Sequence, residues 1–151
     1  MENVKIRRIL VPTDFSDAAG EAVQAAAVLA RAFDAGIELL HVTATVALLP
    51  PPVEIVPFSV LMPDLAKRVE ARLTEEAQRL RTAGIPCDTH TREGSPHTEI
   101  VRRAQEVGAD LIVMGTHGHG GLAHAVLGSV TERVLHRTRC PVLVVPLRRT
   151  T

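Results

Sequence analysis

The sequence predicts an α/β fold, in which an open and mostly parallel sheet carries helices on both faces. Two observations lead to this prediction. Short apolar runs typical of buried strands alternate with segments of helical periodicity, and each strand–helix unit spans about 30 residues, as right-handed crossovers between parallel strands do. The length of 151 residues is that of one domain, which we assign to residues 1–151 as a whole.

The first unit begins with the apolar run of residues 8–12, which we expect to form a strand. Apolar side chains at helical spacing follow, with Ser16 as the candidate N-cap and Gly36 as the candidate for the left-handed residue that ends the helix. Residues 37–42 are again apolar and predict the second strand. The chain therefore starts with a strand, a helix and a second strand.

The connection of residues 44–63 is apolar, rich in proline and long for a compact α/β domain. It fits a cover over a cleft or a partner surface, and equally well an ordered loop that packs on its own subunit. A second helix is predicted from Pro63 to Gly84. The third strand, residues 87–91, is so polar that we expect it at an edge of the sheet.

The remaining elements complete the alternation. A helix is predicted from Ser95, its candidate N-cap, to Gly108, and the fourth strand covers residues 110–115. A glycine-rich loop then leads into a helix at residues 129–137, and an apolar fifth strand follows at residues 140–145. If this apolar strand lies at a sheet edge, pairing with its twin would satisfy its backbone, which predicts a homodimer through the C-terminal strand.

The overall composition excludes several classes of function. With 17 basic and 17 acidic residues the chain has no formal net charge, so we expect neither nucleic acid nor a membrane as a partner. Aromatic residues make up only 2%, too few for a base-stacking platform. The only cysteines, Cys87 and Cys140, are expected to be packing thiols, and no signal peptide or transmembrane segment is found, which together predict a cytoplasmic protein.

The loop after the fourth strand is the best candidate for a binding site. Four glycines lie within residues 115–121, and Gly128 and Ser129 open the next helix. Bare backbone N–H groups and a helix N-terminus favour phosphate, so a side chain at Gly118 or Gly128 would occupy space that phosphates need or would force a positive φ. The alternative is a purely structural turn, in which Ser129 and Glu132 form a capping box. Neither a Walker loop nor a dinucleotide fingerprint is present.

The spacing of these residues is more specific than their composition. The pattern Gly115-x2-Gly118-x9-Gly128-Ser129 resembles the nucleotide-binding signature of the universal stress protein family. The first strand and turn, Ile9-Leu-Val-Pro-Thr-Asp-Phe-Ser16, resemble the opening of that family, as do the segments Leu40-His-Val42 and Asp110-Leu-Ile-Val-Met-Gly115. The resemblance covers essentially the whole chain.

The resemblance implies a five-stranded, Rossmann-like sheet in the order 3-2-1-4-5, a homodimer, and bound ATP with a divalent cation, which we expect to be Mg²⁺ or Mn²⁺. His119 stands where many members have Arg, which leaves the phosphate charge there only partly neutralised. The site residues that the resemblance implies are Pro12, Thr13 and Val42 around the adenine, Asp14 beside the ribose and phosphates, Met114, Gly115 and Gly118 along the ribose and phosphate chain, and Gly128, Ser129 and Val130 at the β- and γ-phosphates.

Other titratable residues add no catalytic or metal site to this interpretation. His117, His119 and His124 lack cysteine or carboxylate neighbours at ligand spacing, so a loop contact with phosphate or solvent is the better interpretation. Asp14 is either a ligand-binding carboxylate, which its position after the first strand favours, or a helix-start residue. The glycine-rich loop contains neither Lys nor Arg to clamp a γ-phosphate, so we assign no catalytic residue.

Three functions of different classes remain. The favoured one is an ATP-binding regulatory protein of the stress response, which acts as a nucleotide-dependent switch on protein partners that the sequence does not identify. The alternatives are a slow ATPase and a nucleotide-free dimeric module for protein interaction. Nucleotide retained by the purified protein would exclude the last of these.

Overall fold

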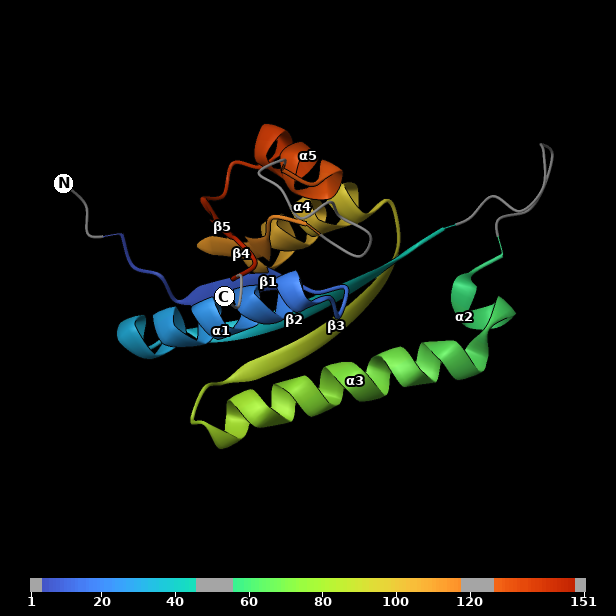
Figure 1. Cartoon of the computed structure of the whole chain (residues 1–151), viewed down its shortest axis with the longest axis horizontal. Coiled ribbons are helices and arrows are strands. Elements are labelled where there is room, and N and C mark those ends of the chain that lie inside the picture. Colours follow the sequence, from blue (N-terminus) through green and yellow to red (C-terminus); the bar gives the residue numbers. More distant parts are fainter. Residues whose placement is uncertain (1–3, 46–55, 118–126, 149–151) are drawn as a thin grey trace.

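The computed structural model describes residues 4–45, 56–117 and 127–148, which form one parallel sheet between two layers of helices (Figure 1). The strands are β1 (Arg8–Pro12), β2 (Gly36–Ala44), β3 (Cys87–Gly94), β4 (Leu111–Gly115) and β5 (Val142–Val145), and the helices are α1 (Asp17–Phe33), α2 (Phe58–Leu61), α3 (Pro63–Thr82), α4 (Pro96–Val107) and α5 (Ser129–Arg137). The strand order is β3-β2-β1-β4-β5, which confirms the predicted fold. None of the helices in the described part of the chain combines the length and apolar character that a membrane crossing requires.

Side chains that alternate along the central strands bury both faces of the sheet. Val11 and Leu39 are fully buried on the face covered by α1 and α3. Leu10 and Leu40 are fully buried on the face covered by α4 and α5. Because both faces are covered, the central strands are continuous apolar runs, which is the pattern that identifies them in the sequence.

The first helix begins as predicted but ends differently. The Ser16 hydroxyl accepts a hydrogen bond from the N–H of Ala19 at 3.2 Å, so Ser16 is the N-cap. At the other end Asp34, with a φ of 54°, takes the left-handed conformation that we predicted for Gly36. Gly36 instead pairs with Arg8 as the first residue of β2. Aspartate visits the left-handed region more readily than most residues do, which is why it can end the helix here.

Both edge strands lie where we predicted, β3 from its polarity and β5 from the strand order that the resemblance implies. The polar strand β3 is at one edge and β5 at the other. β3 continues to Gly94, beyond the predicted end at Thr91, because β2 also continues and its Ala44 pairs with Gly94. The backbone ladder therefore extends these strands further than the apolar run alone would indicate.

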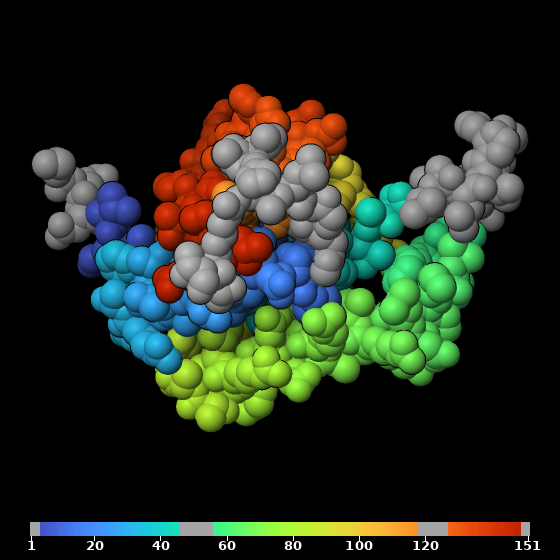
Figure 2. All heavy atoms as spheres, viewed as in Figure 1, coloured from blue at the N-terminus to red at the C-terminus, as the bar shows by residue number. Residues whose placement is uncertain are grey.

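The proline-rich connection contains a short helix that the sequence did not predict. α2 follows residues 46–55, which lie outside the described residues, and α2 and the start of α3 stand at the margin of the molecule (Figure 2). The carboxylate of Glu93, near the end of β3, accepts hydrogen bonds from the N–H groups of Phe58 at 3.2 Å and Ser59 at 2.8 Å. The edge strand thus caps the N-terminus of α2. The exposed side chains of Val60 and Met62 leave this surface apolar.

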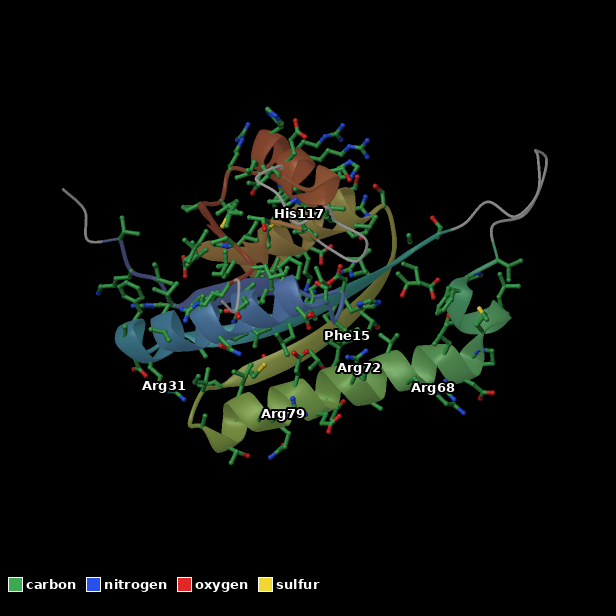
Figure 3. All side chains as sticks on the ribbon, in the orientation of Figure 1. Phe15, Arg31, Arg68, Arg72, Arg79 and His117 are labelled. Carbon is green, nitrogen blue, oxygen red and sulfur yellow. The ribbon has the colours of Figure 1, made fainter. Side chains whose placement is uncertain are left out.

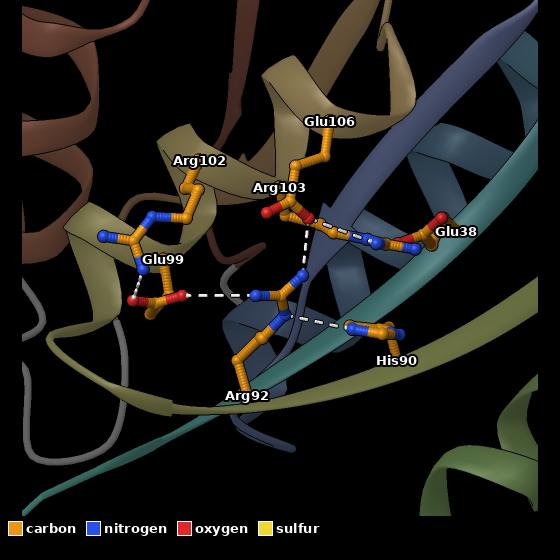
Figure 4. A network of polar contacts seen from close by, with 7 residues as sticks. All are labelled: Glu38, His90, Arg92, Glu99, Arg102, Arg103 and Glu106. Carbon is orange, nitrogen blue, oxygen red and sulfur yellow. Dashed lines mark hydrogen bonds and ion pairs between the residues drawn. The ribbon is translucent and has the colours of Figure 1, made fainter.

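An ionic network fastens α4 to the edge of the sheet (Figure 4). Glu38 of β2 is only 5% exposed and pairs with Arg103 of α4. Arg92 of β3 bridges to Glu106 and Glu99, which is itself buried. A buried carboxylate without its partner is strongly destabilising, so these pairs hold α4 against β2 and β3. The first turns of α4 are thereby held in place beside the carboxyl ends of the strands.

Candidate functional site

A cavity of about 520 Å³ opens at the carboxyl ends of β1 and β4. These strands are joined by a short ladder, in which Ile9 pairs with Leu111 and Leu10 pairs with Ile112. The strand order reverses at this ladder, since β2 and β3 continue to one side and β4 and β5 to the other. Ligands of open α/β sheets bind at such a switch point, and the volume lies within the range of about 300–1,000 Å³ typical of small-molecule sites.

The structure brings the predicted site residues together around this cavity. They come from two parts of the chain, the end of β1 with β2 on one side and the end of β4 with the start of α5 on the other. The predicted residues that line the cavity are Pro12, Thr13, Asp14, Val42, Met114, Gly115, Gly128, Ser129 and Val130. Gly118, His119 and His124 lie outside the described residues. What each lining residue does toward a ligand stays a prediction.

Local hydrogen bonds hold the turn after β1 in one conformation. Thr13 is only 5% exposed, and its N–H donates to the carbonyl of Leu40 in β2 at 2.8 Å. The N–H of Phe15 donates to Thr13 Oγ1 at 3.1 Å. The N–H of Ser16 donates to Asp14 Oδ1 at 3.0 Å. Asp14 therefore lines the cavity and also supports the start of α1, so the two interpretations of this residue do not exclude each other.

Close backbone contacts require glycine at positions 115 and 128. A Cβ on Gly128 would lie 2.8 Å from the carbonyl oxygen of Thr116, which already accepts a hydrogen bond from the Gly128 N–H at 2.6 Å. A Cβ on Gly115 would lie 2.9 Å from the backbone of Ala18 in α1. The φ of Gly128 is −62°, so a positive φ, one of the two reasons considered for a glycine here, does not apply at this position. Glycine is needed here to let the two ends of the loop approach each other.

The N-terminus of α5 faces the cavity, and none of the described side chains caps it. Gly128 is the N-cap and Ser129 is the first helical residue, so the capping box considered for Ser129 and Glu132 is not formed. In a capping box the serine is the N-cap residue, whereas Ser129 lies one position further along, inside the helix. The first N–H groups of a helix have no acceptor within the helix, and two residues of this first turn, Ser129 and Val130, line the cavity. This arrangement suits an anion.

Several lining residues were not predicted from the sequence. Thr131 is 3% exposed, and its hydroxyl donates to the carbonyl of Gly115 at 2.8 Å, which ties α5 to the end of β4. Ile100 and Pro96 contribute a wall from α4. The periodicity of α4 indicates that Ile100 is buried, but not that it borders a cavity. The others are Ala19, Leu40 and His117, of which His117 had been considered only as a loop contact (Figure 3).

The cavity combines an apolar wall with a polar rim of low charge. Leu40, Val42, Ile100 and Met114 provide aliphatic surface. Among the described residues that line it, Asp14 has the only carboxylate and none is Lys or Arg. No group of three or more His, Cys, Asp or Glu side chains gathers as a metal site within the described ranges. The arrangement can hold a flat apolar ring and an anionic group, but it offers no pair of groups for acid–base or nucleophilic chemistry.

The two cysteines lie away from the cavity, as expected of packing thiols. Cys87 is buried, and its burial raises the pKa of its thiol to about 11. Cys140 is partly buried, and its thiol donates to the carbonyl of Ala109 at 3.2 Å. Because the thiolate is the reactive form, a raised pKa makes Cys87 unreactive at neutral pH.

Comparisons with known proteins agree with this architecture. The model of the universal stress protein family matches residues 5–146. The chain is 37% identical over 139 residues to universal stress protein MJ0531 of Methanocaldococcus jannaschii, covering 92% of this chain and 81% of that protein. It is similar to the solved structure of the hypothetical protein MJ0577 of the same organism, with a TM-score of 0.80 and 31% identity over 97% of this chain and 99% of that one.

A third similarity concerns a protein solved with a ligand. The crystal structure of a universal stress protein in complex with cAMP has a TM-score of 0.69 and 28% identity, over 95% of this chain and 99% of that one. The family model spans nearly the whole chain, and the relative MJ0531 is similar over most of its own length as well. The chain therefore belongs to the universal stress protein family.

Proposed function

We propose that the chain binds ATP, together with Mg²⁺ or Mn²⁺, in the cavity between β1 and β4 and acts as a nucleotide-dependent switch in a stress response. The observation that carries this proposal is the meeting, at one switch point, of a turn after β1 in which Thr13 is buried and a helix start after β4 that no described side chain caps. Adenine nucleotides need both an apolar slot and a phosphate site. A relative of known structure, solved with cAMP, supports an adenine nucleotide as the ligand class.

The residues fit the parts of the nucleotide as follows. Pro12, Thr13 and Val42 would surround the adenine, where Pro12 and Val42 offer aliphatic surface. Asp14 would lie beside the ribose and phosphates. Met114 and Gly115 would flank the ribose and phosphate chain, and Gly128, Ser129 and Val130 would hold the terminal phosphates through backbone N–H groups, with Gly118 as a further expected contact.

The divalent ion follows from the charge of the site. A triphosphate carries several negative charges, whereas the described lining residues include neither Lys nor Arg. Backbone dipoles offset only part of that charge, so a hard cation with oxygen ligands is needed, and Asp14 is the nearest carboxylate that could help to hold it. The cation would supply charge neutralisation and orientation of the phosphates.

Binding of this kind predicts slow hydrolysis or none. Acceleration requires groups that act more strongly on the transition state than on the bound substrate, and backbone donors at a helix N-terminus act on both. The described lining residues include no Lys or Arg that could stabilise the charge of the transition state, and no carboxylate other than Asp14 that could orient water. A slow ATPase is therefore the second candidate, and single-turnover hydrolysis at about 1 s⁻¹ or faster would favour it over the switch.

The proposal includes a cytoplasmic homodimer that uses the edge strand β5. The side chain of Leu143 is 39% exposed on this strand, and an open apolar edge favours association with a second copy. A dimer would place two nucleotide sites in one particle, from which the occupied and empty states could recruit different protein partners. A nucleotide-free dimeric module remains the third candidate.

The decisive experiment identifies the ligand directly. The purified protein is denatured, and whatever it releases is identified by mass spectrometry, followed by calorimetric titration of the emptied protein with ATP, ADP and AMP with and without Mg²⁺. The proposal expects a bound adenine nucleotide and an ATP affinity that falls when Mg²⁺ is removed. A protein that releases no nucleotide and gives no binding heat would leave only the interaction module.

A further inference from the structure

Three side chains stack on the face of the sheet opposite to the cavity. The ring of Phe15, in the turn after β1, lies with its centroid 5.0 Å from that of His41 in β2, and the two planes are inclined by 22°. The guanidinium carbon of Arg72, in α3, lies 4.4 Å from the centroid of the Phe15 ring, and the two side chains lie together between α1 and α3 (Figure 3). The stack thus joins three elements that are separate in the sequence.

This stack is linked to the cavity through Thr13. His41 Nδ1 lies 2.8 Å from the carbonyl oxygen of Thr13. A carbonyl oxygen only accepts, so His41 Nδ1 must carry the proton and donate it. The N–H of Thr13 is bonded to the carbonyl of Leu40, the residue before His41. Two consecutive residues of β2 therefore hold both backbone polar groups of Thr13, which itself lines the cavity.

The backbone of Phe15 shows why the turn needs this support. Phe15 has a φ of 64°, a left-handed conformation that bulky side chains rarely adopt. Such a conformation persists only where its surroundings favour it. Here the N–H of Phe15 bonds to Thr13 Oγ1, and its ring is covered on two sides by His41 and Arg72. The stack offsets the strain and keeps the turn in the conformation that borders the cavity.

We infer that His41 and Phe15 are positioning residues for the nucleotide, and that Arg72 extends this link to the outer surface of α3. The inference rests on the proposed function, because it concerns the same site. None of the three side chains lines the cavity. Their effect is on the fraction of molecules in which the turn is ordered, and the apparent affinity falls in proportion to that fraction. A partner that draws Arg72 away from Phe15 would then weaken nucleotide binding across the sheet.

The test compares variants that keep or remove the donor. ATP with Mg²⁺ is titrated into the wild type, His41→Leu and His41→Asn, since the asparagine amide nitrogen occupies a place similar to Nδ1. Loss of the donor should weaken ATP binding by about tenfold in His41→Leu, and His41→Asn should restore most of it. Phe15→Leu, which removes the aromatic stack, should also weaken binding. Equal affinities for His41→Leu and the wild type would overturn the inference.

Helix α3 offers a matched control for Arg72. Arg79 lies two turns further along the same helix and pairs with Glu75. Arg72→Gln should weaken ATP binding by about twofold to fivefold, whereas Arg79→Gln should leave it unchanged. Similar affinities for the two variants would overturn the role of Arg72.

Amide hydrogen exchange in the nucleotide-free protein separates this inference from the proposed function. The N–H groups of Phe15 and Ser16 should exchange faster in His41→Leu than in the wild type, and at nearly wild-type rates in His41→Asn. Unchanged exchange in His41→Leu would overturn the ordering of the turn by the His41 hydrogen bond, even if ATP binds. A wild type that binds no ATP would instead overturn the proposed function, and the exchange rates would still decide whether the hydrogen bond from His41 orders the turn.

Discussion

The contact between Gly128 and Thr116 makes a quantitative prediction for the substitution Gly128→Ala. Ordinary contacts of a Cβ begin near 3.4 Å, and the new Cβ would lie 2.8 Å from the Thr116 oxygen, so the two must separate by about 0.6 Å. The hydrogen bond from the Gly128 N–H to the same oxygen, now 2.6 Å long, would then be stretched and bent. Overpacking of this kind costs about 1–3 kcal/mol, and a weakened hydrogen bond adds up to about 1 kcal/mol.

We therefore expect Gly128→Ala to lower the free energy of unfolding by about 2–3 kcal/mol and to weaken ATP binding as well. Binding is affected because the first turn of α5 would move away from the end of β4. Valine at this position should lower the free energy of unfolding and weaken ATP binding further than alanine does. Urea unfolding of the nucleotide-free protein measures the first effect, and calorimetric titration with ATP and Mg²⁺ measures the second.

The matched control adds the same methyl group where there is room. Gly20 lies inside α1, and a Cβ built on it has, within 4 Å, no contact with described residues beyond its chain neighbours and the backbone of its own helix. Gly20→Ala should raise the free energy of unfolding by about 0.5–1 kcal/mol, because alanine is the better helix former. The reasoning is refuted if Gly128→Ala and the wild type unfold at the same urea concentration while Gly20→Ala shows the expected gain.

Three further predictions follow from the described contacts. Thr131→Val should lower the free energy of unfolding by about 1 kcal/mol, since it removes the hydrogen bond to the Gly115 carbonyl, and Thr131→Ser should not; equal urea midpoints for the two variants would contradict this. Leu143→Lys on the edge strand should convert the proposed homodimer to a monomer in light scattering at micromolar concentration, and a persisting dimer would argue against β5 as the interface. Burial, with the charges of Arg103 and Arg92, lowers the pKa of His90 below its usual 6.5, so the unfolded chain binds the proton more readily and stability should fall as the pH drops through 6.5 toward the folded pKa. His90→Asn should flatten that decline in urea unfolding, and an unaltered pH profile would exclude His90 as its source.

The elements that the sequence predicted well are those whose signal is local. The apolar runs of β1 and β4 are buried on both faces, and Ser16 caps the helix that follows it, so their patterns identify them without knowledge of the fold. The polar strand β3 lies at the edge for the same reason. The end of α1 was misplaced because Asp34 and Gly36 can both take the left-handed conformation, and only the pairing of Gly36 with Arg8 decides between them.

The site was predicted less completely because the walls of the cavity depend on contacts between residues that are distant in the sequence. The resemblance to a family supplied residues such as Thr13 and Gly128, but the reason that Gly128 is glycine is a backbone contact across the base of a loop. Thr131 and Ile100 carry no local signal for a cavity, since one looks like an ordinary helical threonine and the other like a core residue. A buried Glu38 within an apolar strand does signal a charged partner, but its identity as Arg103 requires the fold.

The short ladder between β1 and β4 has a consequence for how the protein opens. β1 and β4 are joined at two residue pairs, whereas β2 and β3 are paired from Ile37 with Cys87 to Ala44 with Gly94. We therefore expect partial unfolding to begin at this seam, with β4, α5 and β5 on one side of it and the other strands on the other side. A nucleotide in the cavity would contact residues on both sides of this seam and hold them together. Its occupancy would then be reported by resistance to proteolysis along β1 and β4.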